Sequence, residues 1–191
     1  LYIERFGSYR RLGRTRDDAA GECLDKVGRM LGLPYPAGPE IDRLATVGDP
    51  AAYALPRGLA GEESLDFSFS GLKTAALNEI NRARQSGGDG DIAGFAASLM
   101  EAVVDELVDR TIKAARQTGV ERVMISGGVA ASRVLRRRME EACAAHGLAL
   151  YVPPVKLCTD NAAMIASAGY FRSLQGERSP LSLNAVPGVR L

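Results

Sequence analysis

Apolar residues recur at three- and four-residue spacing in several parts of the chain, and this period predicts helices. The first such helix has its apolar positions at Ala20, Cys23, Leu24, Val27 and Leu31. Asp17 or Asp18 is placed to cap its N-terminus, and Gly32 is placed to end it. A second, short helix is expected over residues 40–46.

A longer helix is expected to begin after Asp91, its N-cap, and to end at Gly119. Its buried side is marked by Ile92, Phe95, Leu99, Val103, Leu107 and Ile112. Upstream, the stretch DFSFSGLKT (residues 66–74) alternates polar and aromatic residues. This alternation favours a strand with Phe67 and Phe69 turned inward, and a helix starting near Leu72.

The remaining segments mix strands with helices. Residues 1–12 predict two short strands joined at Gly7 and Ser8. Residues 122–142 predict a strand, a Gly-Gly turn and a helix, and LALYVPP (148–154) predicts another strand. A last helix is expected over residues 161–174, capped by Asp160, with small side chains that would let it pack closely against a sheet. The pattern indicates an α/β fold.

Composition narrows the class of protein. The 191 residues are 46% hydrophobic and 25% charged, with a net charge of +1, which is typical of one globular domain. We expect no membrane span and no signal peptide. Three cysteines without a C-x-x-C spacing and one histidine argue against a disulfide framework or a Cys/His zinc site, and they favour a reducing cytosol. Because the chain begins without Met, we expect it to be truncated or part of a longer protein.

Two features near the N-terminus are candidates for chemistry. Asp18, Glu22 and Asp25 lie on one stripe of the first helix, where pairing with Lys26 and Arg29 would make them an ordinary solvated face. That interpretation is favoured on spacing alone. The loop PYPAGP (34–39) is either a rigid connector or a place where Gly38 allows a close backbone approach.

Gly127 and Gly128 stand between the strand and helix of residues 122–142, where backbone amides and a helix N-terminus could bind a phosphate. A tight turn in any α/β protein can also use two glycines, and both interpretations stay open. Four arginines follow on the helix: Arg133, Arg136, Arg137 and Arg138. They could contact phosphates or RNA, but a solvated face paired with Glu140 and Glu141 is the more common arrangement.

Asp160 has two possible roles that do not exclude each other. It could cap the last helix, or its carboxylate could point into a cleft and ligate a metal that carries a nucleotide. A single carboxylate is too few ligands to hold a transition metal tightly.

Four motifs, in this order and at these separations, resemble one family. They are RTRDDAAGECLDKVGRMLGLPYPAGP, DFSFSGLKTA, SGGVAASRVLRRRM and LCTDNAAMIASAG. Together they resemble the TsaD family, the tRNA N6-adenosine threonylcarbamoyltransferases formerly called glycoproteases or O-sialoglycoprotein endopeptidases. The resemblance implies an actin-like ATPase fold of the sugar kinase, Hsp70 and actin type, with two ribonuclease-H-like lobes around a nucleotide. Residues 1–191 would form the C-terminal lobe, a mixed sheet flanked by helices with a helical insertion.

Carried over by position, the resemblance assigns roles to the candidate residues. Asp25 would contact the ribose, and Gly38 would pass close to the nucleotide. Gly127 and Gly128 would lie near the phosphates. Ser132 would contact the nucleotide where the family usually has Asn, so a hydroxyl replaces an amide there.

The resemblance also implies a metal, held in part by Asp160. The ion would be one divalent metal, Fe²⁺ by preference and Zn²⁺ or Mg²⁺ otherwise. The family's two H-x-x-x-H histidines and its first phosphate loop are not in this chain, and His146 cannot replace the histidines. The chain alone is therefore expected to be inactive and to bind metal poorly. A missing first strand would leave an unpaired sheet edge that favours self-association.

The implied reaction transfers the threonylcarbamoyl group from threonylcarbamoyl-AMP to N6 of the adenosine 3′ of the anticodon in tRNA. The implied partners are a TsaB-like paralogue and a TsaE-like ATPase of a bacterial complex, in the cytoplasm. Two alternatives stay open: a non-catalytic scaffold paralogue, and another kinase or ATPase of the same superfamily.

Overall fold

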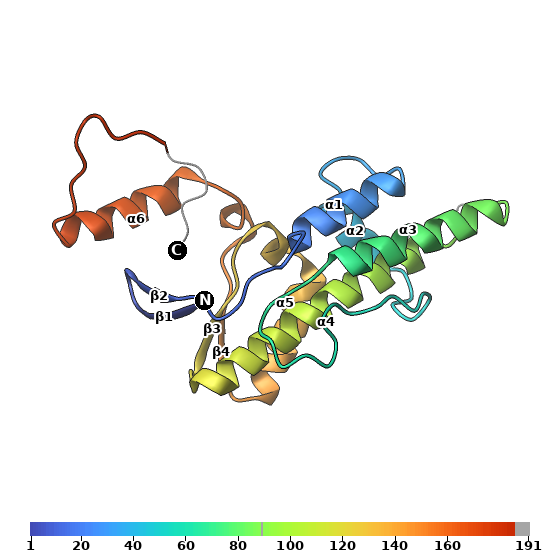
Figure 1. The fold of residues 1–191 in the computed structure, drawn as a ribbon, viewed down its shortest axis with the longest axis horizontal. Helices are drawn as coiled ribbons and strands as arrows, with labels where there is room; N and C mark the ends of the chain where they lie inside the picture. The colour runs from blue at the N-terminus through green and yellow to red at the C-terminus, as the bar shows by residue number, and fades with distance from the viewer. Residues whose placement is uncertain (89, 186–191) are drawn as a thin grey trace.

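The computed structural model describes residues 1–88 and 90–185 (Figure 1). Its elements, in chain order, are β1 (Tyr2–Arg5), β2 (Ser8–Arg10), α1 (Ala20–Met30), α2 (Gly38–Ala45), α3 (Ser70–Gln85), α4 (Ile92–Thr118), β3 (Arg122–Met124), the 3₁₀ turn η1 (Gly128–Ala131), α5 (Arg133–Ala145), β4 (Ala149–Tyr151), the 3₁₀ turn η2 (Val155–Leu157) and α6 (Ala162–Leu174). The mixture of helices and strands agrees with the predicted α/β class.

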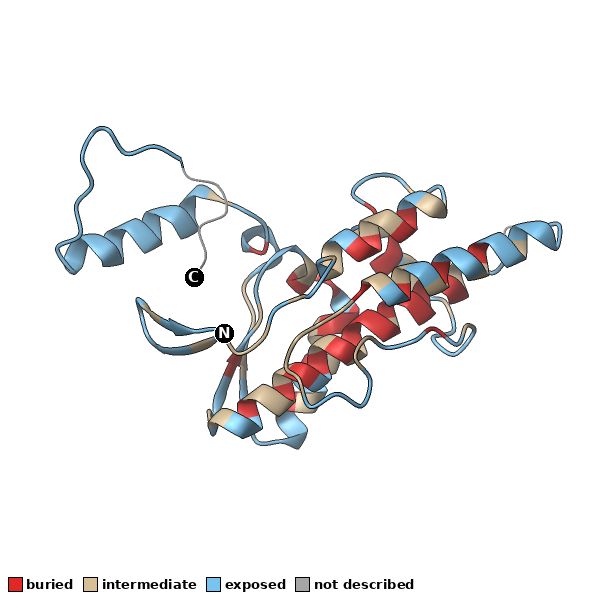
Figure 2. Ribbon diagram, in the orientation of Figure 1, coloured by how far each residue is buried: buried red, intermediate tan, exposed pale blue. Residues whose placement is uncertain are grey.

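The hydrophobic core lies among the helices, around α4. Phe95, Leu99 and Val103 of α4 are buried, as the helical period predicted. Figure 2 shows buried residues along much of α4. Asp91 caps α4 by accepting a hydrogen bond from the Gly94 amide at 2.9 Å, and Gly119 ends it in a left-handed conformation with φ of 68°. Both predicted ends of this helix are confirmed. Residues 19–151, which include α1 to α5, η1, β3 and β4, are called the helical body below.

The strands form two separate pairs within the described residues. β1 and β2 make an antiparallel hairpin, and β3 and β4 pair in parallel across α5. The predicted pair of short strands in residues 1–12 is confirmed. The predicted order of strand, glycine turn and helix over residues 122–142 is also confirmed, with the helix extending to Ala145. The described residues contain no larger mixed sheet that would join these two pairs.

The predicted strand at residues 66–69 is wrong. Only an isolated bridge joins Thr15 to Phe67, and α3 already begins at Ser70. The reason is that carboxylates take the amide hydrogens that a partner strand would need. The Ser68 amide donates to Glu106 at 2.8 Å, and the Phe69 amide donates to Asp17 at 2.8 Å. Phe69 is nevertheless buried, as predicted.

Asp17 and Asp18 do not cap α1, which corrects the expected N-terminus. Ala19 is the N-cap, and its amide donates to Glu22 in the first turn at 3.2 Å. Asp17 instead accepts hydrogen bonds at the start of α3, and Asp18 pairs with Lys26 and with a lysine of α3. These carboxylates fasten the segment that leads out of the β1–β2 hairpin onto the helical body.

The loop between α2 and α3 is held on α4 by two buried charged residues. Glu106 accepts hydrogen bonds from the amides of Gly58 and Ser68, while burial raises the pKa of its carboxyl group. Arg110 donates to the carbonyls of Leu59 and Glu62. The polar groups of this loop are therefore satisfied from the helix beneath it.

α6 is exposed along its whole length, so the expected close packing of its small residues against a sheet is wrong (Figure 2). It touches the hairpin through Phe171, whose ring centroid lies 4.9 Å from that of Phe6. Its N-cap is Asn161, which accepts a hydrogen bond from the Met164 amide at 3.0 Å, so Asp160 is not the cap. Among the helices of the described residues, none has both the length and the apolar character that crossing a membrane requires.

Candidate nucleotide-binding site

Asp25 on α1 joins two of the candidate segments. Its Oδ1 accepts hydrogen bonds from the amides of Ala37 at 2.8 Å and Gly38 at 3.2 Å. α1 and α2 come close because Gly28 has no side chain: a Cβ there would lie 2.2 Å from the Cβ of Ala37. Asp25 therefore fixes the N-terminus of α2, and the predicted pair with Arg29 is not among the ion pairs of the described residues.

Glu22 behaves as the solvated-face interpretation predicted, whereas Asp18 lies before α1, has only 13% of its side chain exposed and pairs with lysines of α1 and α3. Glu22 pairs with Lys26 at 2.8 Å, which is the expected i,i+4 contact, and Asp18 also reaches Lys26 at 2.7 Å. Hydrogen bonds from Lys26 and from Lys73 lower the pKa of Asp18. Only Asp25 of the three turns toward the Gly38 segment.

Gly38 is the first residue of α2, and a Cβ built on it meets no atom within 4 Å. Its φ is not in the left-handed region. Neither packing against the described atoms nor backbone strain therefore requires glycine at this position.

The structure gives a reason for glycine at position 127 but not at position 128. Gly127 has φ of 88°, which side-chain-bearing residues rarely adopt, so the turn itself requires glycine there. Gly128 begins η1 without a positive φ, and a Cβ on it would meet nothing within 4 Å. Both residues are exposed at the end of the β3 strand.

The helix N-terminus expected directly after these glycines lies further along the chain. Ser132, not Gly128, is the N-cap of α5, with η1 between them, and its Oγ accepts from the Leu135 amide at 3.2 Å. The same hydroxyl donates to Asp42 at 2.6 Å. Ser132 is thus buried and engaged inside the protein.

Asp42 is the residue that the sequence interpretation missed. It is buried on α2, and besides the Ser132 hydroxyl it accepts from the Val134 amide at 3.4 Å and from Arg133 Nε at 3.1 Å. The only signal in the sequence was that Asp42 directly follows the apolar Ile41 within the short helix expected over residues 40–46. One carboxylate thereby holds the N-terminus of α5 against α2.

The arginines of α5 are mostly structural. Arg138 pairs with Glu101 and, at 2.8 Å, with Asp105 of α4. Arg137 lies 3.9 Å from Glu141, which is one of the two partners expected for a solvated face. Ion pairs within the protein therefore account for these arginines without a nucleic acid. The carboxylates that pair with them lie mainly on other helices, not on α5 as expected.

Arg136 connects the glycine turn to the segment that leads to Asp160. Its Nε donates to the Ala130 carbonyl at 2.7 Å, and its Nη2 donates to the Pro153 carbonyl at 2.8 Å and to Cys158 Sγ at 3.2 Å. Asp160 follows two residues later and is exposed. A series of hydrogen bonds thus connects the candidate segments. It runs from Asp25 to α2, from Asp42 of α2 to the start of α5, and from Arg136 of α5 to Cys158, two residues before Asp160.

Within the described residues, no group of three or more His, Cys, Asp or Glu side chains is placed to hold a metal ion. Asp160 fits a divalent ion in its chemistry, because an exposed carboxylate is an oxygen ligand suited to Fe²⁺, Mg²⁺ or Zn²⁺. It could supply one ligand of such a site.

Comparison with known proteins gives one consistent result. The family model described as "TsaD: tRNA N6-adenosine threonylcarbamoyltransferase" matches residues 1–167. Curated proteins of that name are similar over the whole chain, with 51% identity in Desulfitobacterium hafniense (strain Y51) and 53% in Geobacillus thermodenitrificans (strain NG80-2). The chain covers 56% of the length of each of these relatives. On this evidence, the chain belongs to the TsaD family.

Proposed function

We propose that the protein to which this chain belongs transfers the threonylcarbamoyl group from threonylcarbamoyl-AMP to N6 of the adenosine 3′ of the anticodon in tRNA. One observation carries the proposal: relatives about half identical to this chain over its full length are named for this transfer. Because the chain covers 56% of those relatives, the activity is assigned to the intact protein.

The proposed architecture is that of an actin-like ATPase, which the TsaD family implies. In it, residues 1–191 form the C-terminal of two lobes, with a mixed sheet flanked by helices and a helical insertion. The parallel β3–α5–β4 unit supports this arrangement, and so does the helical body built around α4.

The proposed nucleotide contacts are Asp25, Gly38, Gly127, Gly128 and Ser132. Support comes from the two glycines, Gly38 and Gly128, that the packing of the described atoms does not require, since a nucleotide could occupy the space that a side chain would fill. The amides of the turn would hold phosphate oxygens and stabilise charge on the departing AMP. Asp25 would hold the ribose in place while it also anchors α2.

Asp160 is proposed as a ligand of one divalent metal, Fe²⁺ by preference and Zn²⁺ or Mg²⁺ otherwise, together with histidines outside this chain. When bound, such an ion supplies a Lewis acid for the carbamoyl and phosphate oxygens. The Arg136 hydrogen bonds to the Ala130 carbonyl and to Cys158 Sγ, two residues before Asp160, support a position of this carboxylate near the glycine turn. We also propose cytoplasmic action with a TsaB-like paralogue and a TsaE-like ATPase.

The transfer can be tested with the intact protein, its proposed partners, threonylcarbamoyl-AMP and an unmodified tRNA transcript, by measuring threonylcarbamoyladenosine in digested tRNA. We expect the wild-type protein to form it and Asp160→Asn to lose most of this activity, because a ligand carboxylate becomes an amide. Glu177→Gln, which changes an exposed carboxylate that follows the C-terminal end of α6 and pairs with Arg172, should stay active. Nucleotide hydrolysis without the modified nucleoside would favour another ATPase of the superfamily, and neither reaction would favour a scaffold.

Nucleotide contact at Gly38 can be tested with a matched pair of glycines. A Cβ meets nothing within 4 Å at Gly38 in α2 or at Gly71 in α3, so Gly38→Ala and Gly71→Ala should both fold. The stability of each is expected to stay equal or rise by up to about 1 kcal/mol, because alanine restricts the unfolded chain. Only Gly38→Ala should weaken AMP binding by the intact protein, measured by calorimetry. Equal AMP affinity in the two variants would remove Gly38 from the site.

A further inference from the structure

The positive charge of the chain is concentrated at its beginning. Residues 1–16 contain five arginines and a single acidic residue, Glu4. The remaining 175 residues contain 19 basic and 22 acidic residues, so the net charge of +1 conceals a basic segment attached to a slightly acidic remainder. Such asymmetry is typical of a surface that binds a polyanion.

Most of the cations elsewhere are already compensated. Arg138 pairs with two carboxylates, Arg133 pairs with Asp42, and Lys73 pairs with Asp18. At the beginning of the chain, Arg16 is held by Asp66 and Glu62. The other four N-terminal arginines are exposed and have no carboxylate within 4 Å among the residues that the structure describes: Arg5, Arg10, Arg11 and Arg14.

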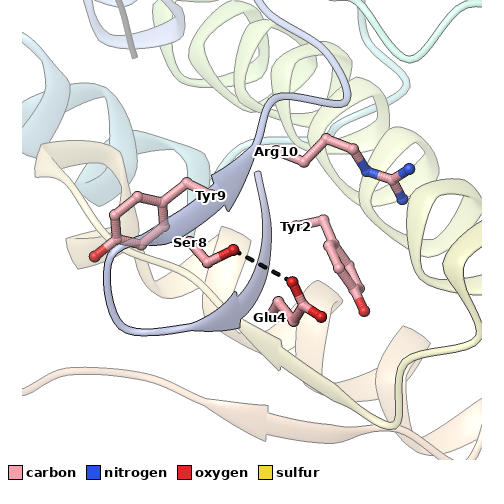
Figure 3. A pocket seen from close by; sticks show the side chains of 5 residues that line it. All are labelled: Tyr2, Glu4, Ser8, Tyr9 and Arg10. Atoms are coloured by element: carbon pink, nitrogen blue, oxygen red, sulfur yellow. Dashed lines mark hydrogen bonds between the residues drawn. The ribbon is translucent and has the colours of Figure 1, made fainter.

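The hairpin combines these arginines with aromatic rings. Tyr2 faces Arg10 across the β1–β2 pair, and the guanidinium carbon of Arg10 lies 5.1 Å from the centre of the Tyr2 ring. Figure 3 shows both side chains at a hollow of about 360 Å³ that Glu4, Ser8 and Tyr9 also line. Glu4 accepts a hydrogen bond from the Ser8 hydroxyl at 3.3 Å. The stacking of Arg10 on half-buried Tyr2, together with exposed Tyr9, suits an RNA, whose phosphates accept from guanidinium groups and whose bases stack on rings.

We propose that residues 2–14, here called the basic hairpin, bind the phosphate backbone of the substrate tRNA. The inference rests on the proposed function, which makes tRNA a substrate, and it adds the surface that receives it. The basic hairpin is a better candidate for binding RNA than the arginines of α5, because Arg136 and Arg138 already make hydrogen bonds and ion pairs within the protein. An acidic protein partner would need the same charges but would not need Tyr2 and Tyr9 beside them.

The test uses the full-length protein and a fluorescently labelled tRNA transcript, with anisotropy measured from about 50 to about 200 mM salt. The triple variant Arg10→Gln, Arg11→Gln and Arg14→Gln should bind tRNA at least about tenfold more weakly at the lower salt. The slope of log affinity against log salt should become shallower by about 2 to 3, because up to three phosphate contacts are lost. Replacing the same residues by lysine should restore most of the slope.

A matched control removes the same charge from the helical body. Arg29, Arg116 and Arg122 are also exposed and have no carboxylate within 4 Å in the described part of the chain. Their triple change to glutamine should leave tRNA affinity within about twofold. An equal loss in both triple variants would show an effect of net charge alone and overturn the proposal, as would unchanged affinity in the hairpin variant.

These experiments distinguish a wrong tRNA-binding surface from a wrong proposed reaction. If the wild-type protein forms the modified nucleoside while the hairpin variant binds tRNA normally, the proposed surface is wrong and the proposed function stands. If the wild-type protein binds tRNA but forms no modified nucleoside, the function is wrong, and the two triple variants still decide where RNA docks. AMP binding, which the hairpin changes should leave unaltered, verifies that each variant is folded.

Discussion

α4 and α6 are both helices rich in alanine and aliphatic residues, but their surroundings in the molecule are opposite. Of the 27 residues of α4, 15 are buried, whereas none of the 13 residues of α6 is buried (Figure 2). α4 lies at the centre of the helical body, with α2 and α5 packed against it. α6 meets the hairpin through Phe171. An apolar helix sequence therefore identifies a helix without showing which other element covers it.

The candidate site includes residues from both the helical body and the segment that leads into α6. Asp25, Gly38 and Ser132 belong to the helical body, where hydrogen bonds fix their positions before any ligand arrives. Asp160 lies at the entrance to α6 and is exposed. We infer that the helical body supplies rigidity to the site, whereas the α6 end supplies an accessible carboxylate.

The strongest test of the contrast substitutes one leucine in each helix of the 191-residue chain. Leu99→Ala in α4 should lower the free energy of unfolding by about 2 to 5 kcal/mol, because Leu99 is fully buried and a cavity would remain. Leu174→Ala in α6 should change it by less than about 0.5 kcal/mol, because Leu174 is 66% exposed. Urea denaturation measures both. A large loss for Leu174→Ala would mean that α6 is packed and that the contrast is wrong.

The sequence predicted the helical body better than the α6 end for a physical reason. Helix ends such as Asp91 and Gly119 depend on local backbone chemistry, which neighbouring residues reveal. The role of Asp17 depends on amides more than 50 residues away, and the role of Asp42 depends on Ser132, 90 residues away. No local period encodes such pairings.

The candidate site divides in the same way. Its glycine positions could be predicted from motifs, and the structure explains Gly127 by its positive φ. Sequence reasoning could not predict that Ser132 would cap α5 from a buried position, or that Asn161 would take the capping role expected of Asp160. The first outcome depends on Asp42, 90 residues away, and the second depends on which of two adjacent polar side chains accepts from the free amides.

A smaller effect on stability is expected when one aspartate in each of the two regions is replaced by alanine. Asp42→Ala should cost about 1 to 3 kcal/mol of folding free energy, because the Ser132 hydroxyl and the Val134 amide lose their buried acceptor. Asp160→Ala should change stability by less than about 0.5 kcal/mol, because this carboxylate is exposed. Thermal unfolding of the two variants gives the comparison. If Asp160→Ala is the more destabilising change, its carboxylate has a structural partner and is not free for a ligand.

The smallest effect concerns Asp17, where the chain passes from the hairpin to the helical body. Partial burial alone would raise the pKa of this carboxyl group, but hydrogen bonds from Ser68, Phe69 and Ser70 outweigh it and lower the pKa to about 2. Since the pKa in the folded state lies below that of the unfolded chain, ionised Asp17 stabilises the fold above about pH 4. That contribution should disappear as the pH falls from about 4 to about 2, and the exposure of Asp17 keeps it modest.

The measurement is the urea midpoint of the wild-type chain and of Asp17→Asn at several pH values. The variant should be less stable at neutral pH, and its deficit should shrink as the pH falls through the range in which wild-type Asp17 is protonated. Ser68→Ala combined with Ser70→Ala removes both hydroxyl donors to Asp17 and should move the acid-sensitive range to a higher pH than in the wild type. Parallel curves for the wild type and Asp17→Asn would show that the carboxylate does not fasten the hairpin segment to α3. The boundary between the two regions would then depend on the other contacts of residues 14–18, which include the backbone hydrogen bonds with Phe67 and the ion pairs of Arg16 and Asp18.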